Sequence, residues 1–376
     1  MLYDALIVGA GPAGSVVAQL LAQAGWRVAL AEKTEFPRRK VCGEFISATT
    51  MPVLEACGVA HAFAAAAGPP VTQLGLYADD VILTAPGGKV WGRALGRERL
   101  DLLLRDAAVA AGAQLFQPVE ITSLRRQAGG FVCGLGDTRL VANTVIAACG
   151  SWNSKGMFAM RSHVALSDLF AFKAHFTASR LPPGVMFLLT FPGGYGGLVH
   201  SDAGRTSLSC CIRRDVLARV RARHGGRAGE AVLAHIMATT RGAREALGAA
   251  VLEGGFLSTG PIHPGMRDRR KNGIFYTGNI AGEAHPIIAE GISMAIQASG
   301  LLARLLIDGR GEDYPQAWAR RFAPRIRIAS LFAHLALNDT GRAAGLALLR
   351  AAPGLISLGA RLSGKSFPVP SRQSSF

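Results

Sequence analysis

The first thirty residues combine short apolar runs with one longer apolar stretch, and this pattern predicts strand, helix and strand in turn. Leu2–Val8 has the length and composition of a buried strand, and the apolar stretch 15–24 has the length of a helix. A second apolar run, 26–31, follows and ends at Glu32. The chain is therefore predicted to open with a βαβ unit.

Apolar runs and turns alternate in the middle of the chain, where two helices are also expected. Runs of this kind are typical of strands, and the turns between them favour an antiparallel sheet. The expected strands are 170–176, 185–191, 197–200 and 207–212, and the expected helices are 215–224 and 230–237. The segment 314–364 is expected to be helical, with seven arginines among its Leu, Ile and Phe residues, and 367–376 to be a flexible tail.

A glycine-rich turn, Gly9-Ala-Gly-Pro-Ala-Gly14, joins the first predicted strand to the first predicted helix. Gly9 permits the tight turn, Gly11 lets a pyrophosphate approach the backbone, and Gly14 lets helix and strand pack closely. The helix N-terminus favours phosphate charge, and Glu32 can accept hydrogen bonds from ribose hydroxyls. The segment therefore predicts a dinucleotide site, which we expect to include Pro12, Ala13 and Lys33.

Two later segments resemble parts of the p-hydroxybenzoate hydroxylase superfamily. Residues 97–101, Arg-Glu-Arg-Leu-Asp, open a predicted helix ending near 111 and resemble the R-x-x-L-D segment of that superfamily. The resemblance implies that Arg97 reaches the FAD phosphate and ribose, although a charged helix start would look the same. Residues 273–292, followed by a predicted helix 293–307, are similar to the G-D-x-A…P…G-x-G segment beside the flavin. The implied cofactor is FAD, with contacts from Gly278, Asn279 (an aspartate in the family), Pro286, Glu290, Gly291 and Ile292.

The loop after the second predicted strand resembles a narrower group of flavoproteins. Its Pro37…Cys42-Gly-Glu44…Ser47 pattern resembles the P…C-G-E-x-x-S segment of geranylgeranyl reductase-like flavoproteins, in which this loop passes beside the flavin. That resemblance adds Arg39, Cys42 and Gly43 to the expected cofactor contacts. Residues 187–192 partly match the Y-x-W-x-F-P segment of the same family. The implied substrate pocket is lipophilic and lined by Phe191, Pro192 and Tyr195.

One position departs from the hydroxylase pattern. The hydroxylases carry A-D-G after a strand, and this chain has Ala148-Cys149-Gly150. Gly150 remains an expected cofactor contact, but Cys149 replaces an aspartate to which the family assigns a role in flavin and nicotinamide handling. The replacement argues against efficient direct use of NADPH or NADH, and a separate flavin reductase is the alternative electron donor.

Three side chains are candidates for catalysis. A Cys42 thiolate stabilised by a neighbouring cation would be reactive, whereas a neutral thiol would only fill space. Glu44 in an apolar cavity would have its pKa raised into the range useful for an acid, or it could simply accept backbone hydrogen bonds. His285 lies inside the predicted flavin segment, where packing against the flavin edge is the alternative to proton transfer.

Composition places few further limits on function. The chain is 49% hydrophobic and 18% charged, which is typical of a globular protein. Its net charge of +16 comes from scattered basic residues with only 7% aromatics, so no nucleic-acid partner is expected. A solvated basic surface, attraction to an anionic cofactor or substrate, and contact with an anionic membrane remain open.

The cysteine spacing bears on metal binding, and the N-terminal residues bear on where in the cell the protein is found. The six cysteines lack metal-binding spacing, so we expect no metal site. No signal peptide is expected, and the protein is predicted to be cytoplasmic. Its basic C-terminal helices would either touch a membrane peripherally or cap the substrate domain.

Together these segments predict an α/β fold, α+β overall, with three parts. A Rossmann-like FAD-binding domain is assembled from the separated segments 1–70, 95–160 and 255–313. An antiparallel-sheet substrate-binding domain comprises 71–94 and 161–254. A C-terminal helical region and tail covers 314–376.

The predicted function is that of an FAD-dependent oxidoreductase, with two reactions in contention. A monooxygenase would use a flavin hydroperoxide to oxidise a lipophilic aromatic or polyketide-like substrate, and the hydroxylase-like frame narrowly favours it. A geranylgeranyl reductase-like enzyme would instead reduce carbon–carbon double bonds in a prenyl or polyene chain. Halogenation is weakened because no W-x-W-x-I-P segment occurs. The non-enzymatic alternative is a flavin-binding accessory protein.

Overall fold

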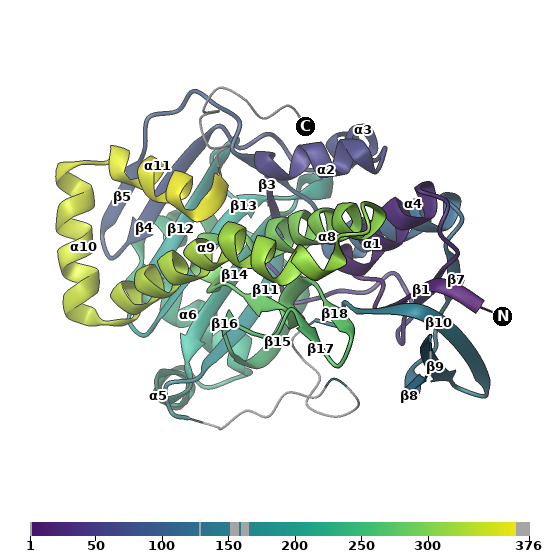
Figure 1. The fold of residues 1–376 in the computed structure, drawn as a ribbon. Helices are drawn as coiled ribbons and strands as arrows, with labels where there is room; N and C mark the ends of the chain where they lie inside the picture. Colours follow the sequence, from purple (N-terminus) through teal and green to yellow (C-terminus); the bar gives the residue numbers. More distant parts are fainter. Residues whose placement is uncertain (1, 128, 151–157, 159–164, 366–376) are drawn as a thin grey trace.

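Two large β-sheets lie side by side in the computed structural model, with helices packed against both (Figure 1). The structure describes residues 2–127, 129–150, 158 and 165–365. The expected tail 367–376 and most of the segment after Gly150 lie outside the described residues. The mixed α/β architecture predicted from the sequence is confirmed.

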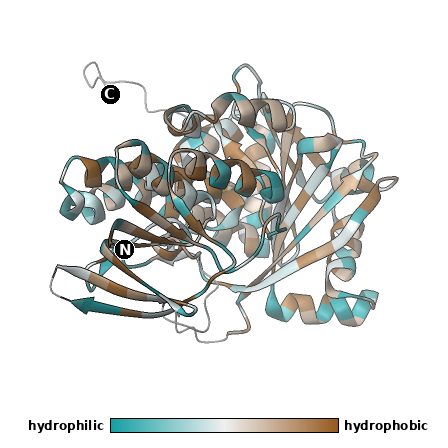
Figure 2. Ribbon diagram, turned by 90° about the vertical axis from the view of Figure 1, so that its right-hand side faces the viewer, coloured by the Kyte–Doolittle hydropathy of each residue, from teal (hydrophilic) through white to brown (hydrophobic). Residues whose placement is uncertain are grey.

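The first sheet has eight strands arranged around β1 (Leu2–Val8). β1 is parallel to β2 (Val28–Ala31) on one side and to β10 (Thr138–Ala147) on the other. All four residues of β2 are buried, because central parallel strands are covered on both faces. Figure 2 shows these strands beside the N-terminus in hydrophobic colours. The remaining strands are β7 (Gln114–Phe116), β8 (Ile121–Gln127), β9 (Gly130–Leu135), β17 (Arg270–Lys271) and β18 (Ile274–Tyr276).

Three helices pack together on this sheet: α1 (Pro12–Gln23), α4 (Arg97–Ala110) and α8 (Gly291–Ile307). α1 begins three residues before the predicted start, because a proline fits the first helical turn, where its missing N–H is not needed. α8 also begins earlier than predicted, at Gly291. The glycine-rich turn and the segment around Gly291 therefore each present the open end of a helix.

The second sheet has seven strands in the order β15-β11-β14-β13-β12-β4-β5. It is antiparallel except for the pair formed by β12 and β4, which is parallel. The predicted domain boundary at residue 255 needs correction, because β15 continues to Ile262 and pairs with β11 over most of its length. The bounds are β4 (Gln73–Ala78), β5 (Val81–Thr84), β11 (Leu169–Thr177), β12 (Val185–Phe191), β13 (Gly194–His200), β14 (Thr206–Arg213) and β15 (Val251–Ile262).

The second sheet is covered by different helices on its two faces. One face packs against α5 (Arg214–His224), α6 (Ala228–Thr239) and α7 (Arg241–Leu247). The opposite face of the second sheet lies against the first sheet and α9 (Tyr314–Leu337). The helices α10 (Asp339–Ala351) and α11 (Gly354–Ala360) continue along the edge of the second sheet (Figure 1). Smaller elements complete the described chain: α2 (Met51–Ala56), α3 (Ala60–Ala66), β3 (Phe45–Ser47), β6 (Gly92–Ala94), β16 (Gly265–Met266) and β19 (Gly282–Glu283).

No single helix in the described part of the chain has the length and hydropathy needed to cross a membrane. The bent pair Asp339–Ala351 and Gly354–Lys365, which meets at 115°, has both when its two parts are taken together.

The contact between α1 and β1 gives a first prediction. A Cβ at Gly14 would lie 1.8 Å from the carbonyl oxygen of Gly9, which is backbone and cannot move away. We expect Gly14→Ala to lower the free energy of unfolding by about 3 kcal/mol, the upper range for overpacking, and to abolish flavin retention. Urea unfolding and the flavin absorbance of the purified protein measure both effects.

A matched control is Gly345→Ala in α10, where no atom lies within 4 Å of the added carbon. It should be neutral or stabilise by up to about 1 kcal/mol, because alanine favours helix more than glycine does. Equal stability of the Gly14 variant and this control would contradict the close-packing role.

Candidate functional site

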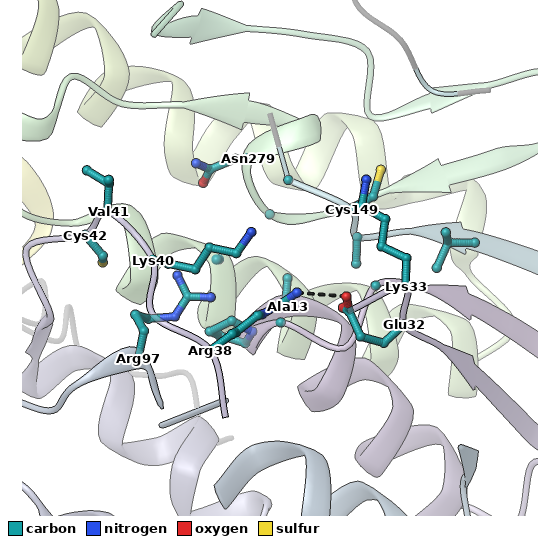
Figure 3. Close-up of a pocket in the computed structure, with 18 of the residues that line it drawn as sticks. Ala13, Glu32, Lys33, Arg38, Lys40, Val41, Cys42, Arg97, Cys149 and Asn279 are labelled. Atoms are coloured by element: carbon teal, nitrogen blue, oxygen red, sulfur yellow. Dashed lines mark hydrogen bonds and ion pairs between the residues drawn. The ribbon is translucent and has the colours of Figure 1, made fainter. Parts of the chain in front are cut away.

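A cavity of about 480 Å³ lies where the glycine-rich turn, the loop 38–42, the end of β10 and the start of α8 meet (Figure 3). In the close-up, Lys40, Arg97 and Cys42 lie toward one end, and Lys33, Glu32 and Cys149 lie toward the other. Of the predicted cofactor residues, those lining this cavity are Gly9, Gly11, Pro12, Ala13, Glu32, Lys33, Arg39, Cys42, Arg97, Gly150, Gly278, Asn279, Gly291 and Ile292.

The three glycines of the first turn have different surroundings. Gly9 has φ +103°, and a Cβ there would approach the carbonyl oxygen of Ala148 to 2.7 Å. Gly14 does not line the cavity and serves the packing of α1 against the turn. Gly11 is open toward the cavity, where the nearest side-chain atoms are the guanidinium groups of Arg38 and Arg97, at 3.7 and 3.8 Å. Gly9 is thus the position of the tight turn, Gly11 is the position that a pyrophosphate can approach, and Gly14 is the position where the helix packs against the turn.

Glu32 holds the turn and one end of the cavity. Its carboxylate accepts hydrogen bonds from the backbone N–H of Ala10 (3.0 Å) and from Thr34, and it pairs with Arg38 at 2.7 Å. Burial opposes ionisation, but Arg38 and these donors together keep the pKa of Glu32 below its ordinary value. An ionised carboxylate at this point can accept ribose hydroxyls.

Positive charge gathers in the cavity beyond what the sequence predicted. Arg38 bridges Glu32 and Asp101, and Arg97 makes a two-pronged pair with Asp101 at 2.6 and 2.8 Å. Burial, together with repulsion from Arg38 and Arg97, lowers the pKa of Lys40. The sequence did not single out Arg38 and Lys40, because nothing local shows that they face the same space as Arg97.

A pyrophosphate fits this arrangement. The first turn of α1 has no side-chain cap and no acidic residue, so its amide groups are available to an anion. An anion at this point would also relieve the mutual repulsion of the cations that line the cavity. The residues present therefore fit the diphosphate of FAD.

The other end of the cavity is formed by the second predicted flavin segment. Gly278 has φ +70°, and the side-chain amide of Asn279 donates to Glu283 at 3.2 Å. Gly291 has no atom within 4 Å of an added Cβ, and α8 begins there without a side-chain cap or an acidic residue in its first turn. Open amides at this helix start fit the carbonyl oxygens of a flavin ring.

Glu290 does not fill the role predicted for it. Its side chain is fully buried and lies outside the cavity lining, because it forms an ion pair with Lys365 at 3.1 Å and accepts from Ser47 Oγ at 3.3 Å. Lys365 also donates to the carbonyl of Ile288. Glu290 therefore holds the loop before α8 in place, through a partner 75 positions later that no local pattern could show.

A second cavity of about 150 Å³ adjoins the first. The two share several lining residues: Val41, Cys42, Thr259, Asn279, Gly291 and Ile292. Gly43 and Pro286, both predicted as cofactor contacts, line this inner cavity instead. Most of its other walls are apolar: Phe45, Met186, Leu188, Leu198, Val199 and Ile287. The junction between the two spaces lies at Cys42.

The predicted substrate pocket is partly corrected. Tyr195 lines the inner cavity, but Phe191 and Pro192 do not. Neighbouring residues of a strand point to opposite faces, and on β12 Phe187, Leu189 and Phe191 face α6 and α7. The residues of β12 that face the inner cavity are Met186 and Leu188.

Glu44 is ionised rather than poised as an acid. It has φ +63°, and its carboxylate pairs with Lys173 at 2.8 Å and with His175 at 2.9 Å, all three side chains being buried. Burial alone would raise the pKa of Glu44, but Lys173 and His175 outweigh burial and hold it well below its ordinary value. The expectation of a raised pKa is wrong, because the two partners lie on a strand about 130 residues away.

His285 stands behind Tyr195 and does not itself line either cavity. Its Nδ1 lies 3.2 Å from the Tyr195 hydroxyl. Burial lowers the pKa of His285 to about 4, so the imidazole is neutral at neutral pH. Burial also raises the pKa of Tyr195 well above its ordinary value. The pair is thus a neutral, hydrogen-bonded wall of the inner cavity.

Comparison with known proteins agrees with this geometry. Residues 2–185 match the FAD binding domain family. The chain is 24% identical over 364 residues to menaquinone reductase of Mycolicibacterium smegmatis, covering 87% of this chain and 84% of the relative. It is 26% identical over 370 residues to digeranylgeranylglycerophospholipid reductase 1 of Methanopyrus kandleri, covering 88% and 89%.

A solved structure extends the likeness to the whole fold. The flavin-dependent brominase Bmp2 superposes with a TM-score of 0.80 at 18% identity, covering 97% of this chain and 94% of that one. Residues 2–185 therefore carry an FAD binding domain, and FAD is its cofactor.

The charge of Lys40 gives a second prediction. Lys40→Gln should weaken FAD binding about tenfold, the value of one charge-assisted contact. In the wild type the affinity should fall as pH rises through the lowered pKa of Lys40, whereas the variant should lack this step. Quenching of flavin fluorescence by the apoprotein measures both. Lys271→Gln, on an exposed lysine outside this cavity, is the control and should bind FAD normally.

The buried Glu44 pair gives a third prediction. The pKa of Glu44 is lower in the folded than in the unfolded chain, so its stabilisation is present above the ordinary value of 4.5 and is lost as pH falls toward the folded pKa. Glu44→Gln should lower the unfolding free energy by about 3 kcal/mol at pH 7, because it leaves Lys173 buried without its counter-charge. The gap from wild type should narrow as pH falls below 4.5.

Urea unfolding between pH 4 and 7 tests this effect. Glu55→Gln, on an exposed glutamate of α2, should show no comparable loss. A stability gap for Glu44→Gln that does not vary with pH would contradict the assignment.

Proposed function

We propose that this oxidoreductase reduces carbon–carbon double bonds in a lipophilic prenyl or polyene chain. The observation that carries the proposal is the junction at Cys42, where an apolar inner cavity opens onto the FAD cavity. The two reductase relatives add support, because their likeness extends over both sheets rather than over the FAD-binding segments alone. The names of both relatives describe reduction of lipids with isoprenoid chains.

The chemistry that FAD would supply when bound and reduced in this cavity is a hydride, and the protein must supply a proton to the neighbouring carbon. Cys42 is our candidate donor, since its thiol lines both cavities. The backbone N–H of Glu44 donates to its sulfur at 3.4 Å, and Arg97 is a further hydrogen-bond partner. These two donors would stabilise the thiolate that remains after proton transfer.

The other residues bind and orient the substrate. Phe45, Met186 and Leu188 present an apolar surface that excludes water and suits a hydrocarbon chain. Tyr195, hydrogen-bonded to the neutral His285 behind it, forms part of the wall without placing a charge beside that chain. The Glu44–Lys173–His175 cluster holds the loop that carries Cys42, so we assign Glu44 a positioning role.

A monooxygenase is the second candidate, which the hydroxylase-like frame had narrowly favoured. The likeness in fold to a flavin-dependent brominase supports chemistry with oxygen on the same framework. The two candidates differ in what reoxidises reduced FAD. A reductase is reoxidised by its lipid without oxygen, whereas a monooxygenase needs oxygen and adds one atom of it to the product.

This difference gives a fourth prediction. Photoreduced enzyme mixed anaerobically with a digeranylgeranyl glycerophospholipid in micelles should regain the oxidised flavin spectrum, with a product heavier by two hydrogens. Photoreduction removes any dependence on the natural electron donor. A flavin that stays reduced until oxygen enters, with a product heavier by one oxygen, would support the monooxygenase instead.

Cys42→Ser tests the proton donor. The variant should retain FAD and slow reoxidation by lipid at least about 100-fold, the lower range for removal of a general acid. Cys133→Ala, in β9 and outside both cavities, is the matched control and should keep the wild-type rate. A wild-type rate in Cys42→Ser would remove Cys42 from the mechanism.

A further inference from the structure

The outer face of α10 is apolar and uncovered. Leu346 is the one buried residue among the thirteen of this helix. Its exposed residues are mostly apolar, with Asp339, Thr340 and Arg350 the polar ones; the apolar ones are Ala343, Ala344, Ala347, Leu348 and Ala351. A helix exposed to water normally carries polar residues on such a face, so α10 is suited to a less polar environment.

The neighbouring elements extend this apolar surface. Among the described residues, thirteen large hydrophobic side chains are exposed, and five of them fall between residues 331 and 362. We call these five the leucine surface: Leu331 and Leu335 on α9, Leu348 on α10, and Leu358 and Leu362 on α11 and the turn after it. Single exposed leucines are ordinary, but such a concentration indicates a contact surface.

The same helices carry a strong positive charge. Residues 314–365 contain seven arginines and one lysine against a single acid, Asp339, which gives a net charge of +7. Arg320, Arg327, Arg350 and Arg361 are exposed, and none of the ion pairs in the described part of the chain involves them. On α9, the spacing of Arg320, Arg327, Leu331 and Leu335 places them along one side of the helix. Basic and apolar residues therefore share one face.

The inner side of this region reaches the substrate cavity. Leu346, Ile356 and Ala360 belong to a buried cluster that also contains Phe45, Met186 and Val199. The last three residues line the inner cavity. Figure 1 shows α10 and α11 at the edge of the molecule, at the opposite end from the N-terminus. The buried sides of α10 and α11 thus belong to the same packed cluster as residues that line the inner cavity.

We propose that α9, α10 and α11 dock on an anionic lipid membrane through the leucine surface and the four exposed arginines. Apolar side chains would enter the headgroup boundary while the arginines meet lipid phosphates. A second copy of the chain fits less well, because a symmetric dimer would place two surfaces of like positive charge together. The bent pair α10–α11 has the hydropathy for this environment.

The docking deepens the proposed function, because it brings a lipid chain to the wall of the inner cavity. It does not depend on the reaction, since membrane binding is measured without substrate and without turnover. A protein that binds vesicles but reduces no lipid would leave the docking in place and refute the reductase proposal.

Flotation of the FAD-loaded protein with vesicles tests the docking. We expect binding to phosphatidylcholine vesicles containing one quarter phosphatidylglycerol, weaker binding at 0.5 M salt, and little binding to phosphatidylcholine alone. Arg350→Gln with Arg361→Gln should weaken binding to the anionic vesicles roughly 25-fold, about fivefold for each charge. Leu348→Ser with Leu358→Ser should weaken it at least tenfold.

The control replaces equally exposed apolar residues elsewhere, Leu166→Ser with Val251→Ser, and should bind like wild type. Retained FAD absorbance and unchanged melting temperature show that each variant is folded. Absence of binding to anionic vesicles at low salt would overturn the proposal. So would wild-type binding by the leucine variant, or a dimer in light scattering that this variant abolishes while vesicles are not bound.

Discussion

The structure depends on holding several cations together around one cavity. Arg38, Lys40 and Arg97 come from a loop and a helix far apart in the chain, and Asp101 and Glu32 compensate only part of their charge. The cations of such a cluster repel one another, and an anion between them relieves that repulsion. The open N-terminus of α1 points to the same place, so the charge and the backbone both favour the diphosphate of FAD.

How well a feature could be predicted from the sequence depends on how far apart its interacting residues lie along the chain. The βαβ unit and its glycines depend on neighbours within about thirty positions, and they were predicted closely. Glu44 was misjudged because Lys173 and His175 lie on β11, and Glu290 because Lys365 follows α11. Phe191 was placed on the wrong face because a strand's alternation shows which residues share a face, but not which face meets the cavity.

The two buried ion pairs link the parts of the molecule at the flavin end of the cavity. Glu44 ties the Cys42 loop to the second sheet, and Glu290 ties the start of α8 to the C-terminal turn. Replacing either pair with apolar residues could cost little stability, because buried pairs contribute little net free energy. Their value lies in orientation: each fixes a loop whose backbone faces the cofactor.

The C-terminal turn connects this site to the outer surface. Lys365 and Gly364, which contact Glu290 and Thr49, directly follow Leu358 and Leu362 of the leucine surface. The ion pair between Lys365 and Glu290 therefore joins the end of α11 to the residue before Gly291, which lines both cavities. The fold thus links the leucine surface to the flavin end of α8 through one buried contact between segments far apart in the sequence.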